Sequence, residues 1–349
     1  MVKKLIRKCV ICRKNTKSLG EQIMAPLPLE RLKPSPPFLN VAVDYFGPLQ
    51  IKGEINRRST GKGYGVLFTC FATRAVFADV AHNYSTEGFL TVFRRFVSIR
   101  GYPAKLYSDN GKQFVGASKE LKLAIKDLKW DIIQDFGAEA GSEWHFSPAD
   151  APWQNGCVES LIKSIKKAIQ TAIGTQVLKF SELQTVLYEA ANLVNERPIG
   201  KNPSEPDEER YLCPNDILLG RASSRVPGGP FKEVSSKRRF EFIQKLVDVF
   251  WRKWTHHYFQ SLIVRQKWHT QKRNVMIGDI VLIKDSNSVR GRWKLGRVNK
   301  TIASGDGYVR RCVVVYKQQP PGIKLASKFT SIERPIQDLV VIIPKDEDA

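Results

Sequence analysis

The sequence has no long hydrophobic run and few cysteines. The 349 residues contain no run of about 18 consecutive apolar residues, which a membrane-spanning helix requires. The N-terminus MVKKLIRKCVICRK also lacks the apolar centre of a signal peptide. The six cysteines are scattered and do not form the framework of a secreted disulfide-rich protein. We therefore predict an intracellular protein that does not act in a membrane.

Acidic residues are also in short supply. The chain has 34 Asp and Glu against 56 Lys and Arg, which gives a formal net charge of +22. Such a surplus favours a polyanionic partner, either nucleic acid or an anionic membrane surface. With 42% hydrophobic and 26% charged residues, the chain can bury a full core and is long enough for two or three domains. Because no membrane segment is present in the sequence, we expect DNA as the partner.

A proline-rich run ends the basic N-terminal part of the chain. The run MAPLPLERLKPSPPF has prolines at positions 26, 28, 34, 36 and 37. These prolines are incompatible with a continuous helix or a central strand. We predict a linker over residues 26–37.

The segment after this linker alternates between strand-like and helix-like patterns. Short apolar runs rich in Val and Phe occur in LNVAVDYFGPL and GYGVLFTCFATRAVFADVA, and PAKLYSDNGKQF is typical of a strand that ends in a turn. Apolar residues recur at helical spacing between a cap at Ser85 or Thr86 and a stop at Gly101, and again over residues 156–173 and 181–197. This alternation predicts a mixed α/β core.

The C-terminal part is basic and changes pattern. After a polar connection, RRFEFIQKLVDVFWRKWTHHYFQSLIVRQKW is a long amphipathic helical stretch whose apolar face requires a partner surface. Its Trp251, Trp254 and Trp268 are more typical of core residues than of base-stacking platforms. The runs DIVLIKD, KLGRVNKTI and VRRCVVVYK are typical of strands in a small β-barrel. Residues 232–312 carry nineteen Lys and Arg against six Asp and Glu, so this part is strongly basic.

Three carboxylates occupy positions from which they can meet at the end of a sheet. Asp44 lies inside an otherwise apolar strand, where an unpaired carboxylate is costly, so something must compensate it. Asp109 lies where a strand meets a turn, and Glu159 lies in the first turn of a helix. Clustered carboxylates repel one another unless cations neutralise them, and their oxygens suit Mg²⁺ or Mn²⁺. Two such ions can activate an attacking oxygen and stabilise the leaving oxygen of a phosphodiester.

The segments around these carboxylates resemble the catalytic core of the integrases of retroviruses and long-terminal-repeat retrotransposons; they are VAVDYFGPL, SDNGKQF and NGCVESLIKSIKKAI. The 49 residues between Asp109 and Glu159 exceed the spacing in retroviral integrases and are similar to that of BEL/Pao-type elements. Further resemblance to that group lies in EWHFSPADAPWQNG, WRKWTHHYFQSLIVRQKW, IGDIVLIKD, RWKLGRV and GDGYVRRCVV. The resemblance covers about residues 5–317, and its specificity comes from the order of the motifs.

The resemblance implies an RNase H-like fold with a DDE motif, in which Asp44, Asp109 and Glu159 bind two Mg²⁺ or Mn²⁺ ions. It implies metal-dependent DNA strand transfer, in which a 3′-hydroxyl of element DNA attacks a target phosphodiester in line. Water performs the same attack during processing of the element ends. It further implies a homo-oligomer that acts on element ends and target DNA, and we expect this to take place in the nucleus.

Several polar residues are predicted to contact DNA. Lys163 and Lys166 follow Glu159 by four and seven residues, near the same face of the helix, and resemble the lysines with which integrases hold the DNA end. Asn155 occupies a mobile-loop position where the relatives also place a polar amide. The remaining predicted DNA contacts are Lys167, Arg292 and Lys294.

These patterns predict five parts. They are a partial zinc-binding-domain remnant at 1–25, the linker at 26–37, the RNase H-like catalytic core at 36–224, a basic helical segment at 225–270 and a small SH3-like β-barrel at 271–343. Integrases carry a His-His-Cys-Cys zinc domain before the core, and Cys9 and Cys12 have the spacing of half a zinc site. The first histidine is His82, so either the sequence begins inside that domain or the zinc site has been lost. We therefore do not expect zinc to bind.

Each carboxylate has a simpler explanation when it is taken alone. Asp44 could be a buried aspartate satisfied by backbone donors, Asp109 an ordinary Asp-Asn-Gly turn residue, and Glu159 a stabilising acid in a first helical turn. Two alternatives for the whole chain also stay open. One is a decayed or domesticated DNA-binding protein without catalytic activity, and the other is an RNase H-type nuclease.

Overall fold

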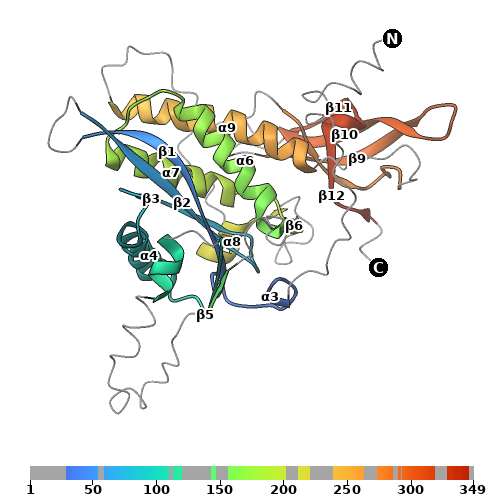
Figure 1. Ribbon diagram of the computed structural model, residues 1–349. Coiled ribbons are helices and arrows are strands. Elements are labelled where there is room, and N and C mark those ends of the chain that lie inside the picture. Colours follow the sequence, from blue (N-terminus) through green and yellow to red (C-terminus); the bar gives the residue numbers. More distant parts are fainter. Residues whose placement is uncertain are drawn as a thin grey trace, which may run out of the picture.

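The computed structural model describes residues 29–53, 59–109, 113–119, 143–146, 156–201, 211–220, 239–262, 273–285, 290–291, 293–318 and 328–345, with the backbone alone at 156–160, 201, 261, 318 and 328. Two five-stranded sheets, with helices packed on the first, make up most of this part (Figure 1). The mixed α/β class predicted from the sequence is confirmed.

The first sheet consists of β1 (Asn40–Lys52), β2 (Thr60–Cys70), β3 (Val76–Ala81), β4 (Lys105–Ser108) and β5 (Glu143–Phe146). Its strand order is β3-β2-β1-β4-β5. β1 pairs antiparallel with β2, and β2 pairs antiparallel with β3. β4 runs parallel to β1, and β5 runs parallel to β4. This mixed strand order is compatible with the RNase H-like core that the sequence predicts.

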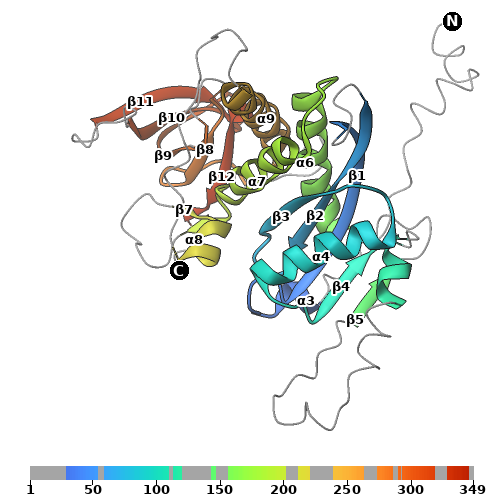
Figure 2. The ribbon, with the colours of Figure 1, turned by 90° about the vertical axis from the view of Figure 1, so that its left-hand side faces the viewer.

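Helices lie on both faces of this sheet. The principal ones are α4 (Thr86–Arg100), α6 (Gly156–Ile173), α7 (Phe180–Asn195) and α9 (Arg239–Leu262). In Figure 2, α4 lies on one side of β1, β2 and β3, and α6 and α7 lie on the other. Shorter elements complete this part: α3 (Leu29–Leu32), α8 (Pro214–Leu219), β6 (Gly200–Lys201) and β7 (Tyr211–Leu212).

Side chains along β1 alternate between the two faces. Val41 and Tyr45 belong to the hydrophobic cluster under α4, whereas Ala42 and Phe46 belong to the cluster under α6 and α7. Because successive residues of a strand point to opposite faces, Asp44 shares the face of Ala42 and Phe46. The only acidic residue of β1 therefore lies on the side of α6.

Helix α4 begins and ends where the sequence predicts. The Ser85 hydroxyl accepts a hydrogen bond from the Gly88 backbone N–H at 3.1 Å, which caps the first turn. Gly101 follows the helix with a φ of 83°, in a region that favours glycine. Phe96 faces the sheet and stacks on Phe68 with ring centroids 4.3 Å apart. The helix is thus fixed at both ends and along its apolar face.

Helix α9 packs on α6 and α7. Its buried residues, including Trp251 and Trp254, belong to the same hydrophobic cluster as those of α6 and α7. Trp251 is 2% exposed and Trp254 is fully buried, which confirms the prediction that both are core residues. The partner surface that the sequence requires for this helix is therefore the helical layer of the first sheet. No helix among the described residues is both long and apolar enough to cross a membrane.

The second sheet is antiparallel throughout and lies in the region where a small SH3-like barrel is predicted. Its strand order is β11-β10-β9-β8-β12. The sequence predicts three of these strands, at the positions where β8, β9 and β10 are found. The elements are β8 (Ile280–Ile283), β9 (Lys294–Ala303), β10 (Val309–Gln318), β11 (Lys328–Pro335), the 3₁₀-helix η4 (Ile336–Asp338) and β12 (Leu339–Ile343).

Two local features add to what the sequence predicts. The predicted linker contains the single helical turn α3 between its prolines, and Glu30 in that turn forms an ion pair with Lys105 of β4 at 2.9 Å. This contact ties the segment to the first sheet. The turn predicted after β4 leads into a helical segment at residues 113–119, where Phe114 and Ala117 pack into the cluster under α4. Burial therefore accounts for the helical segment at 113–119, whereas no residue of α3 is buried.

Arg290 connects the segment before β9 to the helical layer. Its guanidinium is 1% exposed and lies 3.3 Å from a carboxylate oxygen of Asp248 and 3.9 Å from one of Glu189. It also donates to the Gln244 backbone and side-chain oxygens, at 3.3 and 2.8 Å. A buried cation with this many acceptors fixes α7, α9 and the start of β9 relative to one another.

We predict that Arg290→Met lowers the free energy of unfolding by about 3 kcal/mol, because it leaves carboxylates at a buried site without their cation. Arg297→Met, which removes an exposed arginine of β9, should change stability by no more than about 0.5 kcal/mol. Urea unfolding of both variants measures the difference. Equal stability of the two variants would show that Arg290 does not hold the two parts together.

Candidate active site

Asp44 and Asp109 lie on adjacent parallel strands. β1 and β4 pair with Ala42 opposite Tyr107. Asp44 follows Ala42 by two residues, and Asp109 follows Tyr107 by two residues. Residues two apart on a strand share a face, and both Ala42 and Tyr107 pack into the cluster under α6 and α7. The register therefore brings the two carboxylates to the same side of the sheet, at the point where β4 ends.

The end of β4 is anchored by β5. The indole Nε1 of Trp144 donates to the Ser108 hydroxyl at 2.9 Å, and that hydroxyl donates to the Asp109 backbone oxygen at 2.9 Å. Ser108 is fully buried and Trp144 is 9% exposed. The exposed Asp109 side chain thus follows directly from a rigid, buried strand end.

The two carboxylates repel each other. Burial raises the pKa of Asp44 above its usual value, and the negative charge of Asp109 raises it further. The Lys166 ammonium acts in the opposite direction but does not cancel both effects. The Asp44 carboxylate therefore lies in surroundings that favour an additional positive charge.

Lys166 supplies the main charge compensation at Asp44. Its Nζ donates to Asp44 Oδ2 at 2.5 Å, across 122 residues of sequence, and the two side chains are 22% and 37% exposed. The backbone N–H of Tyr45 has a smaller effect on the pKa of Asp44 than Lys166 has. Lys166 and a backbone donor therefore share the compensation of this aspartate.

The donor set fits a hard divalent cation. Asp44 and Asp109 present carboxylate oxygens, the ligands that Mg²⁺ and Mn²⁺ prefer, and the Lys166 ammonium already occupies a cationic position at Asp44. Across the described ranges, no three His, Cys, Asp or Glu side chains gather closely enough to hold a metal ion. The described part of the site is thus a pair of carboxylates, to which the predicted third ligand would be added.

That predicted third ligand, Glu159, lies in α6, and its side chain is outside the described residues. It precedes Lys166 by seven residues, which is two helical turns, so both positions lie on the same face of α6. Lys166 contacts Asp44, so this face of α6 is the one directed at the carboxylate pair. The convergence of Glu159 with Asp44 and Asp109 stays a prediction.

Lys163 and Lys167 are exposed on α6. Burial lowers the pKa of His257 in α9, and the nearby positive charges of Lys167, His256 and Lys253 lower it further. Positive charges of α6 and α9 therefore lie close to one another, and α6 is the helix whose Lys166 contacts Asp44. Such a surface suits the phosphates of a nucleic acid.

The structure does not place Lys294 at this site. Lys294 Nζ donates to Asp285 Oδ2 at 3.2 Å and lies 4.1 Å from the ring centroid of Tyr316, so its charge is engaged within the second sheet. Its contact with DNA stays a prediction. Four further predictions lie outside the described residues: Asn155, Arg292, Cys9 and Cys12.

Tyr84 and Gln113 belong to the site although neither is singled out by the sequence. The Gln113 Nε2 donates to the Tyr84 hydroxyl at 3.0 Å. The Tyr84 ring lies 5.1 Å from that of Tyr45, the residue after Asp44, and burial raises the pKa of Tyr84. The SDNGKQF motif contains Gln113 and was the one sequence pattern that could have indicated it. Tyr84 lies between β3 and α4, outside the motifs of the sequence analysis.

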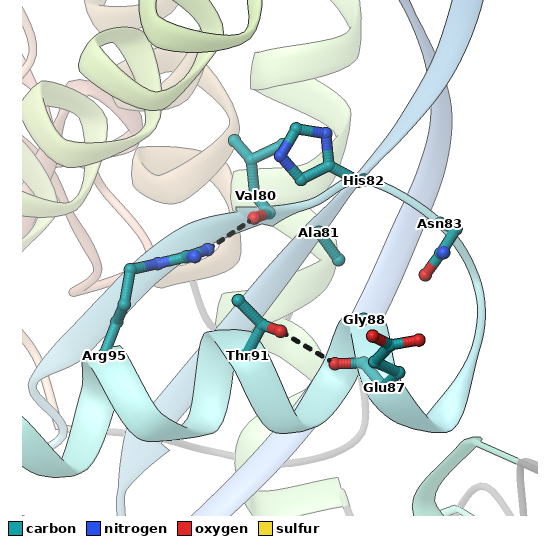
Figure 3. Close-up of a pocket in the computed structure, with 8 residues that line it drawn as sticks. All are labelled: Val80, Ala81, His82, Asn83, Glu87, Gly88, Thr91 and Arg95. Carbon is teal, nitrogen blue, oxygen red and sulfur yellow. Dashed lines mark hydrogen bonds between the residues drawn. The ribbon is translucent and has the colours of Figure 1, made fainter.

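A cavity of about 180 Å³ lies elsewhere, between the end of β3 and α4 (Figure 3). Arg95 borders it and donates to the Val80 backbone oxygen at 2.7 Å and to Asp79 at 2.6 Å. β3 is the edge strand of the sheet, two strands away from Asp44. Neither Asp44 nor Asp109 lines this cavity, and its arginine is committed to a buried aspartate.

The C-terminal part of the chain matches a known family model. Residues 238–342 match DUF5641, a family of unknown function. The match contains α9 and the second sheet but no strand of the first sheet, so it does not include the carboxylates.

Many solved protein chains are similar to this chain, and one of them is similar over most of its length. No curated protein matches this chain. The solved structure is a chain of the simian T-cell lymphotropic virus intasome in complex with the PP2A regulatory subunit B56 gamma, determined by cryo-EM. The two chains are 13% identical with a TM-score of 0.38, and the similarity covers 98% of this chain and 90% of that chain. A similarity at this identity and TM-score assigns no role to Asp44 or Asp109.

We predict that Mg²⁺ or Mn²⁺ raises the thermal stability of the wild-type protein. An ion at ten times its Kd should stabilise the folded state by about 1.4 kcal/mol, because it binds that state alone. Asp44→Asn and Asp109→Asn should lose most of this effect. Glu143→Gln is the matched control, since Glu143 is an exposed carboxylate at the opposite end of the same sheet. Thermal unfolding over a metal titration gives the result, and an equal response of all four proteins would exclude metal binding at this pair.

The raised pKa of Asp44 predicts a pH effect in the absence of divalent ions. Between the usual value of 3.8 and the raised value, the folded state binds more protons than the unfolded state, so stability falls as the pH rises through this range. Asp44→Asn removes this loss. The stability of the variant relative to wild type should therefore increase as the pH rises above 3.8. Urea unfolding in a chelator at several pH values measures it, and a constant difference would contradict the prediction.

Proposed function

We propose that this protein is an integrase of the retrotransposon type, which joins the 3′ ends of element DNA to target DNA in a metal-dependent reaction. The observation that carries the proposal is the parallel register of β1 and β4, which sets Asp44 beside Asp109 on the face of α6. The order of the sequence motifs supports the BEL/Pao type in particular. The basic surface of α6 and α9 provides the charge that a DNA partner requires.

In the proposed reaction, Asp44, Asp109 and Glu159 hold two Mg²⁺ or Mn²⁺ ions. When bound, these ions lower the cost of the charge that develops on the attacking and leaving oxygens of a phosphodiester. Lys166 holds Asp44 in place before the ions and DNA arrive. It is then free to exchange the Asp44 carboxylate for a DNA phosphate, because both are anionic oxygen acceptors.

The other residues of this chain orient the DNA. Lys163 and Lys167 extend from the exposed side of α6, and we propose that they contact phosphates next to the reacting one. Asn155, Arg292 and Lys294 are further proposed contacts. We also propose that the enzyme acts as a homo-oligomer on two element ends, since two target strands must be joined in a coordinated way, and that it does so in the nucleus.

A strand-transfer assay tests the proposal. Purified protein is incubated with Mg²⁺ or Mn²⁺, a labelled duplex that ends in the element's terminal sequence, and target plasmid. Asp109→Asn and Glu159→Gln should lower the rate of joining about a hundredfold to a thousandfold, as expected when charge stabilisation at a reacting centre is lost. Glu143→Gln should join DNA at the wild-type rate.

The outcomes separate the alternatives. Metal-dependent joining that both variants lack supports an integrase with this active site. Cleavage of RNA in RNA–DNA hybrids without joining would instead indicate an RNase H-type nuclease. Binding of DNA by all proteins with no product, while a control integrase is active, would show a DNA-binding protein without catalytic activity.

The lysines of α6 predict the salt dependence of binding. Each phosphate contact contributes about 0.9 to the slope of log Kd against log salt for duplex DNA. The double variant Lys163→Gln and Lys167→Gln should therefore reduce this slope by nearly two units. Lys284→Gln, in which a lysine paired with Asp338 is removed, should leave the slope unchanged. Fluorescence anisotropy over a salt series measures the slope, and an unchanged slope in the double variant would place the DNA elsewhere.

A further inference from the structure

An exposed tyrosine stands beside the carboxylate pair. Tyr84 is 51% exposed, although it lies in the short segment between β3 and the buried first turn of α4. Its ring packs on Tyr45, which follows Asp44 in β1, and its hydroxyl accepts an N–H from Gln113, four residues after Asp109. An aromatic ring that is open to solvent at a site for phosphodiester chemistry presents a face on which a flat group can stack.

The Tyr84 ring is held in one position from behind. Its ring centroid lies 5.1 Å from that of Tyr45, with an interplanar angle of 76°, and 5.3 Å from that of Tyr64. Tyr45 is 8% exposed and packs in turn against Phe114, with ring centroids 5.4 Å apart. The exposed ring therefore rests on two further aromatic rings, and its contact area is already ordered before any ligand binds.

Gln113 fixes the other end of the Tyr84 side chain. Its amide N–H donates to the Tyr84 hydroxyl, and the whole residue is only 2% exposed. The Oε1 of the same amide has no hydrogen-bond partner among the described residues, although it is buried. A buried acceptor without a donor has a free-energy cost and is uncommon in folded proteins.

The site has different chemistry on its two sides. Asp44 faces α6, where Lys166 and the exposed lysines provide positive charge for phosphates. Tyr45, with Tyr84 against it, belongs to the opposite face of the sheet, under α4. The carboxylates thus lie between a cationic side and an aromatic side. A nucleotide has the matching pair of groups, a phosphate and a flat base.

We propose that Tyr84 stacks on a nucleobase of the substrate strand and so positions the adjacent phosphodiester at Asp44 and Asp109. This rests on the proposed function, because the substrate is taken to be DNA. Stacking on an aromatic ring tolerates any base, so the contact adds affinity without strong sequence preference. A strand whose base is unpaired next to the reacting phosphate is the form that fits, because a base inside a duplex has no free face.

Tyr102 is a matched control for Tyr84. It is also 51% exposed, its hydroxyl accepts an N–H from Arg94 at 3.2 Å, and its ring packs on Phe93 with centroids 6.0 Å apart. It follows the other end of α4, about 24 Å along the helix axis from the Ser85 cap. The two tyrosines therefore differ in their distance from the carboxylates rather than in exposure or packing.

The test measures binding of a short, fluorescein-labelled single-stranded oligonucleotide of mixed sequence. Tyr84→Ala should weaken binding about tenfold, and Tyr84→Leu should weaken it nearly as much, because leucine keeps apolar bulk but has no π face. Tyr84→Phe should stay within about threefold of wild type, since the ring remains. Tyr102→Ala should bind as the wild type does.

A salt series separates stacking from charge. Stacking releases no counterions, so the slope of log Kd against log salt should be the same for Tyr84→Ala and wild type. Thermal unfolding of each variant shows that it is folded. Equal binding by Tyr84→Ala and Tyr102→Ala, or equal loss in Tyr84→Phe and Tyr84→Ala, would overturn the stacking proposal while leaving strand transfer intact. If wild-type protein binds no DNA at all, both the proposed function and the stacking proposal fail.

Discussion

The carboxylate of Asp44 is the group around which the site is built. It lies in β1 between buried apolar residues, and the parallel pairing with β4 brings Asp109 to the same face. Two like charges in partial burial raise the free energy of the folded state unless a cation is present. The ammonium of Lys166 is that cation in this structure. The position of α6 relative to the first sheet follows from the same contact and from the hydrophobic cluster beneath it.

This contact links the fold to the proposed chemistry. Helix α6 carries Lys166 on the face that meets Asp44, exposed lysines on the next face and apolar residues against α7 and α9. One helix therefore contributes to the core, to the charge balance of the site and to the surface that suits DNA phosphates. The anchoring of β4 through Trp144 and Ser108 keeps Asp109 at a fixed place relative to Asp44. Rigid placement of charged groups is what electrostatic stabilisation of a reacting phosphate requires.

Much of this arrangement could be predicted from the sequence, because the information is local. The cap at Ser85, the stop at Gly101 and the helical period from Gly156 to Ile173 fix α4 and α6. Charge and apolar surroundings also indicate that Asp44 needs a compensating partner. The identity of that partner is not local, because Lys166 is 122 residues away and its contact with Asp44 depends on how α6 packs on the sheet.

Other features lie beyond sequence patterns for the same reason. Strand β5 has only four residues, too few for an alternating pattern, and it is defined by its pairing with β4. Tyr84 is an unexceptional exposed residue in the sequence, and it belongs to the site only through Tyr45 and Gln113, which come from distant segments. The helical turn of α3 lies within a proline-rich segment, and its Glu30 pairs with Lys105, which is 75 residues away.

The most direct test of the central claim is X-ray diffraction from crystals soaked in Mn²⁺, measured for its anomalous signal. The account predicts an anomalous peak that contacts carboxylate oxygens of both Asp44 and Asp109, at the short distances typical of hard cations, about 2.0 to 2.6 Å. It also predicts that Lys166 Nζ is then no longer hydrogen-bonded to Asp44 alone. Crystals that bind Mn²⁺ elsewhere, with the Lys166–Asp44 ion pair unchanged and no peak at the two aspartates, would contradict the assignment of this pair as a metal site.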